Sequence, residues 1–429
     1  MARINRLSTH EIMEVSRDTF NKLSSQQHID ISAVGKFFDS ARFDLSDEEI
    51  KDVQLALVLI ASAHKLSEKL FDDAKRLLNL CDFLSSYNGN PVQRVVHYFT
   101  KALQEKIARE TGRECRESRE SKPLCPLDLV TKGVDPAFIS CCLRVPCIRI
   151  SQFAAIQAVL DSLASARKVH FVDLTIRSGI HCPVLMQALA NRHEKPVEFL
   201  KITAFATPQT KQKTEEIGKC LTCLAETLNL PFLFCVAMIP DIKDLEKEML
   251  NITDDEVVAV FSLNVLRHTT SVPDFLKSFS RFLRNLNPCV LAVVESEELG
   301  NSLVFIDHFH ESLISYGSFY DCIQACIDQG DPNRAVLEVM VGHQIRCTVA
   351  AKDEERIYSR QMNIEEWRDY FSGFGMVETE VSMSSFDQAT LLQKNFASEK
   401  SCLLVRNGKC LVIGWKGTPF FSVSAWKFQ

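Results

Sequence analysis

Residues 169–173 read VHFVD, a short apolar run that ends in an acidic residue and precedes a helical stretch. The same pairing of a β-rich run with a helical stretch recurs four times downstream. Alternation of this kind predicts a parallel sheet with helices on both faces. The later runs are VEFLKITAF (197–205), FLFCVAM (232–238), EVVAVFSL (256–263) and CVLAVVESE (289–297).

The last third of the chain changes character and predicts antiparallel strands. Strand-like runs cover 376–382, 401–406, 410–415 and 424–428, and Asn407-Gly408 is a hairpin signal between two of them. An antiparallel hairpin added to a parallel sheet is typical of methyltransferase-like folds. The predicted fold is therefore α/β and Rossmann-like, with a methyltransferase-type, mostly parallel sheet.

The N-terminal part predicts an α-helical cap over residues 48–112. Residues 54–63, QLALVLIASA, are apolar on every side, so a helix here must be surrounded by partners. Asn90-Pro91 supplies an N-cap and a first-turn proline for a helix with an apolar stripe down to residue 107. Further upstream, Ser8 and Glu11 form a candidate capping box for a short helix.

The bulk composition excludes several classes of protein. Of 429 residues, 46% are hydrophobic and 24% charged, and no run of about 18 uncharged apolar residues could span a bilayer. The N-terminus lacks the apolar core of a signal peptide, so the sixteen cysteines are expected to be reduced thiols in the cytoplasm or nucleus. A net charge of -6 argues against binding nucleic acid through a broad basic face.

Cysteine spacing does not predict a metal site. Cys220 and Cys223 form one CxxC, but a second pair at metal-ligand spacing is missing from the sequence. We expect these two residues to be structural thiols. The same expectation holds for Cys141, Cys142, Cys322 and Cys326.

The loop after the first strand is the place to test for a nucleotide or S-adenosylmethionine site. Such a loop needs glycines so that the backbone can approach the ligand, and the next strand should end in a carboxylate for the ribose. Residues 173–179 contain one glycine, and Leu174, Ile176 and Arg177 place side chains where the cofactor should lie. The second strand ends ITAFA at 202–206 without an acid. No cofactor is predicted, although topology keeps a divergent methyltransferase as an alternative.

Three isolated features could carry chemistry, and each has a simpler structural interpretation. His170 is predicted to be a packed or hydrogen-bonded core residue on the face opposite Phe171. Asp173 is predicted to cap the loop that follows it. The acids Glu295, Glu297 and Glu298 at the end of the fifth run favour a solvated turn over a paired-carboxylate catalyst.

Several blocks, taken together, resemble the plant GRAS family of transcription regulators. NPVQRVVHYFTKAL (90–103) is similar to the family's DPxQRxAxYFxxAL, and LPFLF closes a second leucine-rich region. GWKGTPFFSVSAWKF (414–428) resembles the closing SAW block. The VHIID-like core is Val169, His170, Phe171, Val172 and Asp173, and the SAW residues are Ser424, Ala425 and Trp426.

The chain also departs from the family's pattern. Cys182 stands where tryptophan is usual, and the PFYRE-like segment lacks the usual asparagines and arginine. In the stretch that resembles the family's RVER motif, only Arg356 clearly matches the motif. No DELLA or TVHYNP sequence occurs, so the resemblance does not imply a gibberellin-degron role.

The resemblance implies a nuclear transcription co-regulator that acts by protein binding, without catalysis. Its cap would pair with other GRAS proteins, its core would dock DNA-binding transcription factors, and DNA would be contacted mainly indirectly. A direct DNA-binding factor is a further alternative. The interface anchors proposed for pairing are Val95, Val96, Tyr98 and Phe99. The expected segments are 1–45 (N-terminal), 48–112 (cap), 113–165 (linker with short helices) and 166–429 (core), with blocks VHIID-like 139–204, leucine-rich 214–246, PFYRE-like 255–351 and SAW-like 354–428.

Overall fold

The chain forms two compact units, each built from two separate stretches of sequence. One contains Met1–Pro123 and Glu298–Ile357, the other Leu124–Glu297 and Tyr358–Gln429. In the parts of the chain that can be described, every helix is too short or too polar to cross a membrane. The computed structural model describes residues 6–24, 45–112, 136–240, 244–266, 274–297, 302–351 and 362–429.

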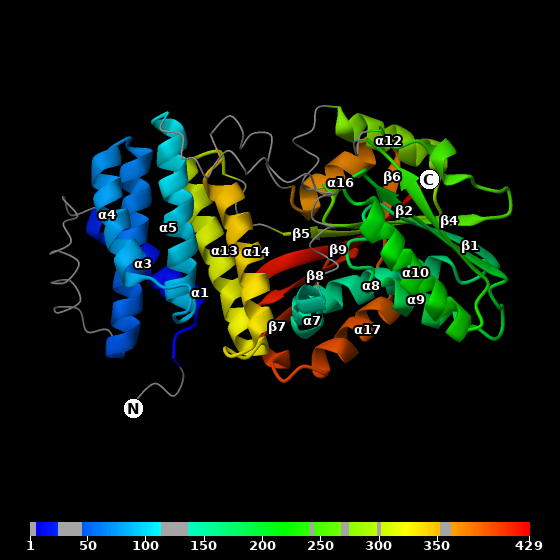
Figure 1. The fold of residues 1–429 in the computed structure, drawn as a ribbon, viewed down its shortest axis with the longest axis horizontal. Coiled ribbons are helices and arrows are strands. Elements are labelled where there is room, and N and C mark those ends of the chain that lie inside the picture. Colours follow the sequence, from blue (N-terminus) through cyan, green and yellow to red (C-terminus); the bar gives the residue numbers. More distant parts are fainter. Residues whose placement is uncertain are drawn as a thin grey trace. The chain divides into compact units, whose positions relative to one another are not determined.

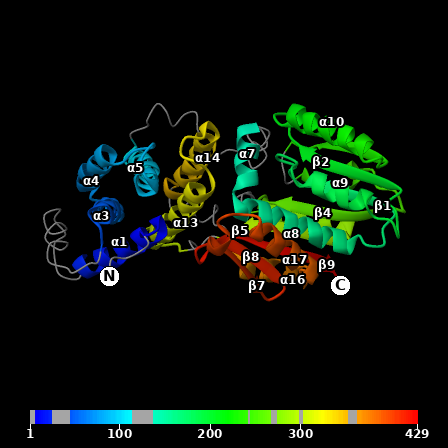
Figure 2. The same cartoon turned by 90° about the horizontal axis from the view of Figure 1, so that it is seen from below.

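The first unit is a bundle of helices (Figure 1), several of which are seen nearly end-on in Figure 2. Helix α3 contacts α1, α4 and α5, and α5 also contacts α13 and α14. The bounds are α1 (Thr9–Ser24), α3 (Asp47–Ser67), α4 (Phe71–Leu84), α5 (Pro91–Glu110), α13 (Phe305–Cys326) and α14 (Pro332–Val349).

The N-terminal helices begin where the sequence signals predict. Ser46 and Asn90 each form a capping box, with Glu49 and Gln93 respectively, and the Ser8–Glu11 box precedes α1. Helix α3 is buried from Leu55 to Ala63, as its all-round apolar pattern requires. These helices therefore combine strong local starts with a face that must pack against neighbours.

The helical unit contains more of the chain than the expected cap, residues 48–112. Helices α13 and α14 lie within the segment assigned to the α/β core, yet they pack in the helical unit. The reason is an aromatic seam: the Phe99 ring lies 5.6 Å from that of Phe309, and the Tyr98 ring lies 6.0 Å from that of Tyr320. The apolar stripe of α5 is thus covered from within the chain.

The second unit is a doubly wound sheet with the order β3-β2-β1-β4-β5-β9-β8-β7. Strands β1 to β5 pair in parallel, while β9, β8 and β7 continue antiparallel and β6 pairs with β9. This confirms the predicted Rossmann-like fold. The strands are β1 (Lys168–Asp173), β2 (Phe199–Ala206), β3 (Phe232–Met238), β4 (Val257–Leu263), β5 (Val290–Ser296), β6 (Met376–Thr379), β7 (Cys402–Asn407), β8 (Cys410–Trp415) and β9 (Thr418–Phe428).

Helices cover both faces of the sheet (Figure 1). Helices α8 and α10 contact strands on one side, and α9 lies between them. On the other side a large apolar core joins α12 and α16 to sheet residues such as Val172 and Trp426. The helices are α7 (Pro136–Arg144), α8 (Pro146–Ser162), α9 (Cys182–Ala190), α10 (Lys211–Thr227), α12 (Phe275–Leu286), α16 (Ile364–Gly373) and α17 (Met383–Lys394), with short 3-10 turns η4 (Lys247–Leu250) and η5 (Glu399–Ser401).

Three local expectations differ from the structure. Helix α8 falls in the expected linker, but it packs on β5 and β9 because its buried side chains belong to the sheet's covering layer. The dipeptide Thr207-Pro208 predicts a capped helix start with a first-turn proline, but α10 begins at Lys211, because Thr207 and Thr210 form a turn before it. Strand β6 stops at Thr379, because only Met376–Thr379 pairs with β9.

Candidate functional site

The loop after β1 is filled by its own side chains. Leu174 and Ile176 are completely buried. Gly179 has φ +64, and a Cβ there would lie 2.8 Å from Ile217 Cγ2 of α10. This glycine therefore serves the turn and the close packing of α10, not the approach of a ligand to the backbone.

Arg177 closes the same edge of the sheet. It adopts φ +49 and donates a guanidinium N–H to the carbonyl of Asn264, 2.7 Å away, beyond the end of β4. At the end of β2 the backbone turns through Thr207 and Thr210 without a carboxylate. The two positions that would anchor a nucleoside thus carry a side-chain bridge and a neutral turn.

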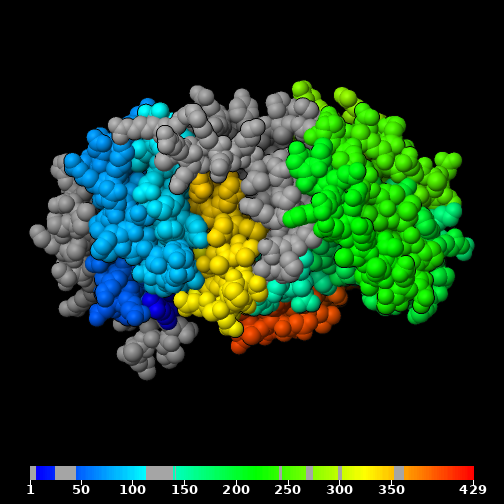
Figure 3. All heavy atoms as spheres, viewed as in Figure 1, coloured from blue at the N-terminus to red at the C-terminus, as the bar shows by residue number. Residues whose placement is uncertain are grey.

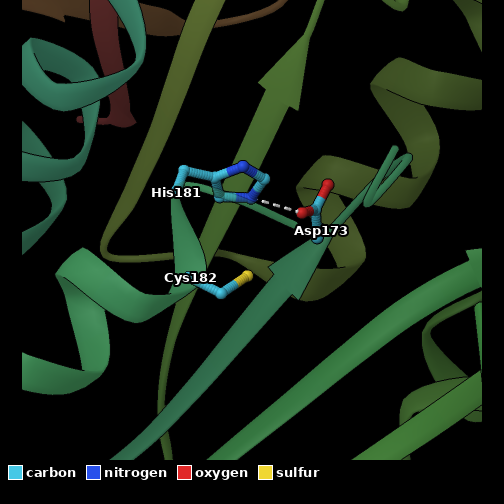
Figure 4. Close-up of side chains that lie close together, drawn as sticks. All are labelled: Asp173, His181 and Cys182. Carbon is cyan, nitrogen blue, oxygen red and sulfur yellow. Dashed lines mark hydrogen bonds and ion pairs between the residues drawn. The ribbon is translucent and has the colours of Figure 1, made fainter. Parts of the chain in front are cut away.

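Asp173, at the end of β1, is the centre of a buried polar cluster. Its Oδ1 accepts the backbone N–H of Thr175 at 3.1 Å, so the predicted capping role is confirmed. Its Oδ2 lies 2.7 Å from Nε2 of His181, and Cys182 follows at the first turn of α9. Figure 4 shows His181 and Cys182 extending from the start of α9 toward the strand end. All three side chains are inaccessible to solvent.

Burial and neighbouring groups shift the pKa values within this cluster. Burial alone would disfavour the imidazolium, but the Cys182 sulfur and the Asp173 carboxylate outweigh it and raise the pKa of His181 to about 10. Burial raises the pKa of the Cys182 thiol. The His181 ring therefore lies in contact with the Asp173 carboxyl group, beside a thiol whose burial disfavours the charged form. The His181 Nδ1 atom has no hydrogen-bond partner among the described residues.

Sequence reasoning missed this cluster because Asp173 lies at the end of β1, whereas the adjacent His181 and Cys182 lie at the start of α9. Asp173 was recognised as a strand-end acid, and Cys182 only as a departure from the family's tryptophan. A His-Cys-Pro sequence at a helix start, downstream of a strand-ending acid, is the signal that could have pointed to it. The carboxyl end of β1 and the start of α9 meet at the same edge of the sheet.

His170 is a core residue, as predicted. Its Nδ1 lies 2.9 Å from Glu256 Oε2, its Nε2 lies 2.8 Å from Thr203 Oγ1, and the ring is fully buried. Burial, assisted by Lys201, lowers the pKa of His170 to about 4, so the ring is neutral near pH 7. A fully enclosed neutral imidazole with both nitrogens occupied holds the sheet together and offers no base to a substrate.

The acids at the end of β5 do not form the predicted solvated turn. Glu295 is buried, and its Oε1 accepts the N–H of Leu266 at 2.8 Å. Burial raises the pKa of Glu297 to about 7, although Ser422 donates a hydrogen bond to it. The solvated-turn interpretation is wrong for Glu295 because the loop after β4 folds over it. Glu298 lies outside the described residues.

The SAW residues lie at the centre of the second unit. Ser424 pairs with Val293, Ala425 with Ala292, and Trp426 with Leu291 across the β5–β9 boundary. The Trp426 ring lies 4.6 Å from that of Phe371, and its Nε1 donates to Ser424 Oγ at 2.9 Å. The prediction that this tryptophan packs inside the protein is confirmed.

Most of the proposed pairing anchors are buried within the helical unit, and their role in pairing stays a prediction. Val95, Val96 and Phe99 have no exposed surface. Tyr98 is partly buried, with its ring against Gly342 of α14. Since α13 and α14 cover the stripe that these residues form, a partner could reach it only by displacing them.

An exposed apolar face lies elsewhere on the same unit. Phe83 is 85% exposed in the last turn of α4, and Tyr87 is 61% exposed in the turn that follows this helix, with Leu84 between them in the sequence. Figure 3 shows the helical unit from α4 to α5 in blue and cyan, with α4 at its surface. Residues 83, 84 and 87 are called the 83–87 face below. Three neighbouring large apolar side chains in solvent are typical of a protein contact.

The remaining cysteines and charged stretches have simple positions. Cys220 and Cys223 are exposed on α10, Cys142 and Cys322 are buried, and Cys326 is intermediate. The Cys141 side chain and residues 113–135 lie outside the described part of the chain. Arg356 of the RVER-like stretch also lies outside the described residues.

Comparisons with known proteins give one consistent result. A model of the GRAS domain family matches residues 55–427. The chain is 29% identical over 384 residues to the DELLA protein RGL1 of Arabidopsis thaliana, covering 89% of this chain and 71% of that protein. It is 28% identical over 388 residues to the DELLA protein GAI1 of Vitis vinifera, covering 89% of this chain and 63% of that protein.

The chain spans about two thirds of the length of these curated relatives. A solved structure, the crystal structure of SCL7 in Oryza sativa, matches with a TM-score of 0.73 and 24% identity. The match covers 87% of this chain and 99% of that one. At this identity the likeness shows a shared fold.

Proposed function

Because the chain belongs to the GRAS domain family, whose members are plant transcription regulators, we propose that it is a nuclear co-regulator that works by binding proteins and not by catalysis. The main support for the absence of catalysis in this proposal is the filled loop after β1. Leu174 and Ile176 occupy its interior, and Arg177 bridges it to Asn264. An S-adenosylmethionine enzyme needs open backbone at this position.

The pairing surface in this proposal is the 83–87 face, in place of the buried stripe of α5. Large aromatic side chains at a contact centre supply most of the binding free energy in many interfaces. Phe83 and Tyr87 are the two exposed aromatic residues here, and they lie at the end of a helix that is fixed by α3 and α5. The proposed occupant is the same face of a second copy, as in a two-fold dimer.

The core unit is proposed to dock DNA-binding transcription factors, which the family relationship suggests. Net charge supports indirect contact with DNA, since the chain carries -6 and its described helices lack a continuous basic face. A direct DNA-binding factor would instead show affinity for duplex that falls steeply with salt.

Sedimentation equilibrium of the full chain tests the pairing surface. The wild-type chain should form a dimer, and a Phe83→Ser, Tyr87→Ser double variant should weaken the dimer roughly a thousandfold or more, because each lost anchor removes about 2 kcal/mol. Val339→Ser is the matched control, since Val339 is 59% exposed on α14. Unchanged dimerisation of the double variant would exclude the 83–87 face.

Isothermal titration with S-adenosylmethionine and its demethylated product tests the alternative function. The proposal expects no heat of binding at micromolar concentrations. Saturable binding that is lost when Asp173 is changed to Asn would instead favour a divergent methyltransferase. The two experiments are independent, so failure of the pairing surface leaves the non-catalytic assignment standing.

A further inference from the structure

The cluster at the end of β1 brings together three different metal-binding side chains. Asp173, His181 and Cys182 each offer one donor atom, and these atoms all lie within 4.8 Å of one another. They come from the end of a strand and the first turn of α9, so the backbone fixes their approach (Figure 4). Within the described parts of the chain, this is the one such group of three.

We propose that Asp173, His181 and Cys182 bind a zinc ion. One sulfur, one nitrogen and one oxygen donor form a set that suits Zn²⁺, which accepts thiolate, imidazole and carboxylate in tetrahedral sites. Calcium and magnesium need mostly oxygen ligands and larger coordination numbers. A thiol in the set therefore selects against both. This inference goes beyond the proposed regulatory function and does not depend on it.

The present geometry needs a small adjustment to accept the ion. His181 Nε2 and Asp173 Oδ2 are 2.7 Å apart because they share a hydrogen bond. Tetrahedral bonds of about 2.1 Å to each atom place nitrogen and oxygen about 3.4 Å apart. The required opening is about 0.7 Å, which rotation of the two side chains can supply.

The charges of the three ligands also suit the ion. Zn²⁺ binds neutral imidazole, thiolate and carboxylate, so loading the site releases the protons that the ligands carried. A carboxylate and a thiolate together balance the two charges of the ion.

A second observation at this turn also fits a ligand. The Thr175 hydroxyl is fully buried and has no hydrogen-bond partner among the described residues. Its own backbone N–H donates to Asp173 Oδ1, so the hydroxyl belongs to the same turn. Buried hydroxyls are normally satisfied, and such an exception calls for a further group nearby.

Burial decides how the ion would be loaded and what it would do. All three ligands are closed to solvent, so zinc would enter during folding or through a local opening of α9. Once bound, it would cross-link the start of α9 to the end of β1. The expected role is structural, since a closed site has no room for a substrate.

The test uses the full chain with Cys220→Ser and Cys223→Ser, because these exposed thiols on α10 could bind metal adventitiously. Purified without chelators, this background protein should contain about one zinc per chain. X-ray absorption should find one sulfur at about 2.3 Å and nitrogen or oxygen at about 2.0–2.2 Å. Background protein free of zinc, even after refolding with equimolar zinc, would overturn the proposal.

Cobalt substitution locates the thiol. Refolding with Co²⁺ should give a sulfur-to-cobalt charge-transfer band that Cys182→Ser abolishes. Cys147→Ser is the matched control, because Cys147 is equally buried but contacts the Gly414 carbonyl. If Cys182→Ser does not fold, as judged by circular dichroism, Asp173→Asn replaces it and should lower bound zinc at least tenfold. A band that survives the folded Cys182→Ser variant would assign the metal elsewhere.

Discussion

Replacing Phe99 by alanine separates a core role from an interface role. Phe99 has no exposed surface and lies edge-on to Phe309 and Tyr316, with ring centroids at 5.6 and 6.1 Å. Truncation of a buried phenylalanine costs about 3–5 kcal/mol, which includes the cavity left behind. With a urea dependence of about 1–3 kcal/mol/M, the unfolding midpoint of the helical unit should fall by about 2 M.

The assay can follow the two units separately. The chain has three tryptophans, and Trp367, Trp415 and Trp426 all belong to the second unit. Tryptophan fluorescence therefore reports on the second unit alone, while far-ultraviolet circular dichroism reports on the helices of both units, so a circular-dichroism change without a fluorescence change marks the first unit. Phe99→Ala should shift the transition that circular dichroism detects for the helical unit, and it should leave the fluorescence-detected transition nearly unchanged.

The matched control is another phenylalanine of the same unit. Phe83 is 85% exposed, so Phe83→Ala should change stability by less than about 0.5 kcal/mol. It should weaken pairing, whereas folded Phe99→Ala should still pair. If Phe99→Ala shifts the urea midpoint no more than Phe83→Ala does, the packing of α5 against α13 described above is incorrect.

Three further changes test the second unit. Gly179→Ala should cost about 1–3 kcal/mol in urea unfolding, because φ is +64 and the new Cβ meets Ile217 at 2.8 Å; unchanged stability would mean that the turn can rearrange. Glu297→Gln should flatten the pH profile of stability. The folded pKa of about 7 lies above the reference value of 4.5, so the free energy of unfolding of the wild type should fall by up to about 3 kcal/mol as the pH rises from 4.5 through 7. Equal pH slopes of stability for wild type and variant would refute the buried state of Glu297. Trp426→Ala should cost about 3–5 kcal/mol in the fluorescence-detected transition, because its ring packs on Phe371, and a loss below about 1 kcal/mol would place the ring outside the core.

Local signals along the chain predicted the second unit well. Short apolar runs such as VHFVD became β1 to β5, and Asn407-Gly408 joined β7 to β8 with Gly408 at φ +60. Strand identity and hairpin chemistry depend on neighbouring residues, so they can be recognised in sequence. The same holds for the buried imidazole at His170, whose place on an alternating strand put it inside the sheet.

The sequence could not reveal which segment covers the apolar stripe of α5. The stripe with Val95, Val96 and Phe99 is apolar whether it meets a partner or another helix of its own chain. Its actual cover, α13, lies about 200 residues downstream and was assigned to the other unit. An apolar stripe indicates that a helix surface must be covered, but it does not indicate whether a partner protein or another helix of the same chain covers it.

The order of apolar and polar residues by itself determined an α/β sheet with an added antiparallel end, a helical cap, and a first loop poor in glycine. Only the tertiary structure decided which helices complete the cap, which aromatic residues remain in solvent, and that Asp173, His181 and Cys182 converge. The physical reason is range. Helix starts, turns and strand alternation are set by residues a few positions apart, whereas the cover of an apolar stripe depends on contacts between distant segments. The polar cluster depends on how the fold places the start of α9 against the end of β1.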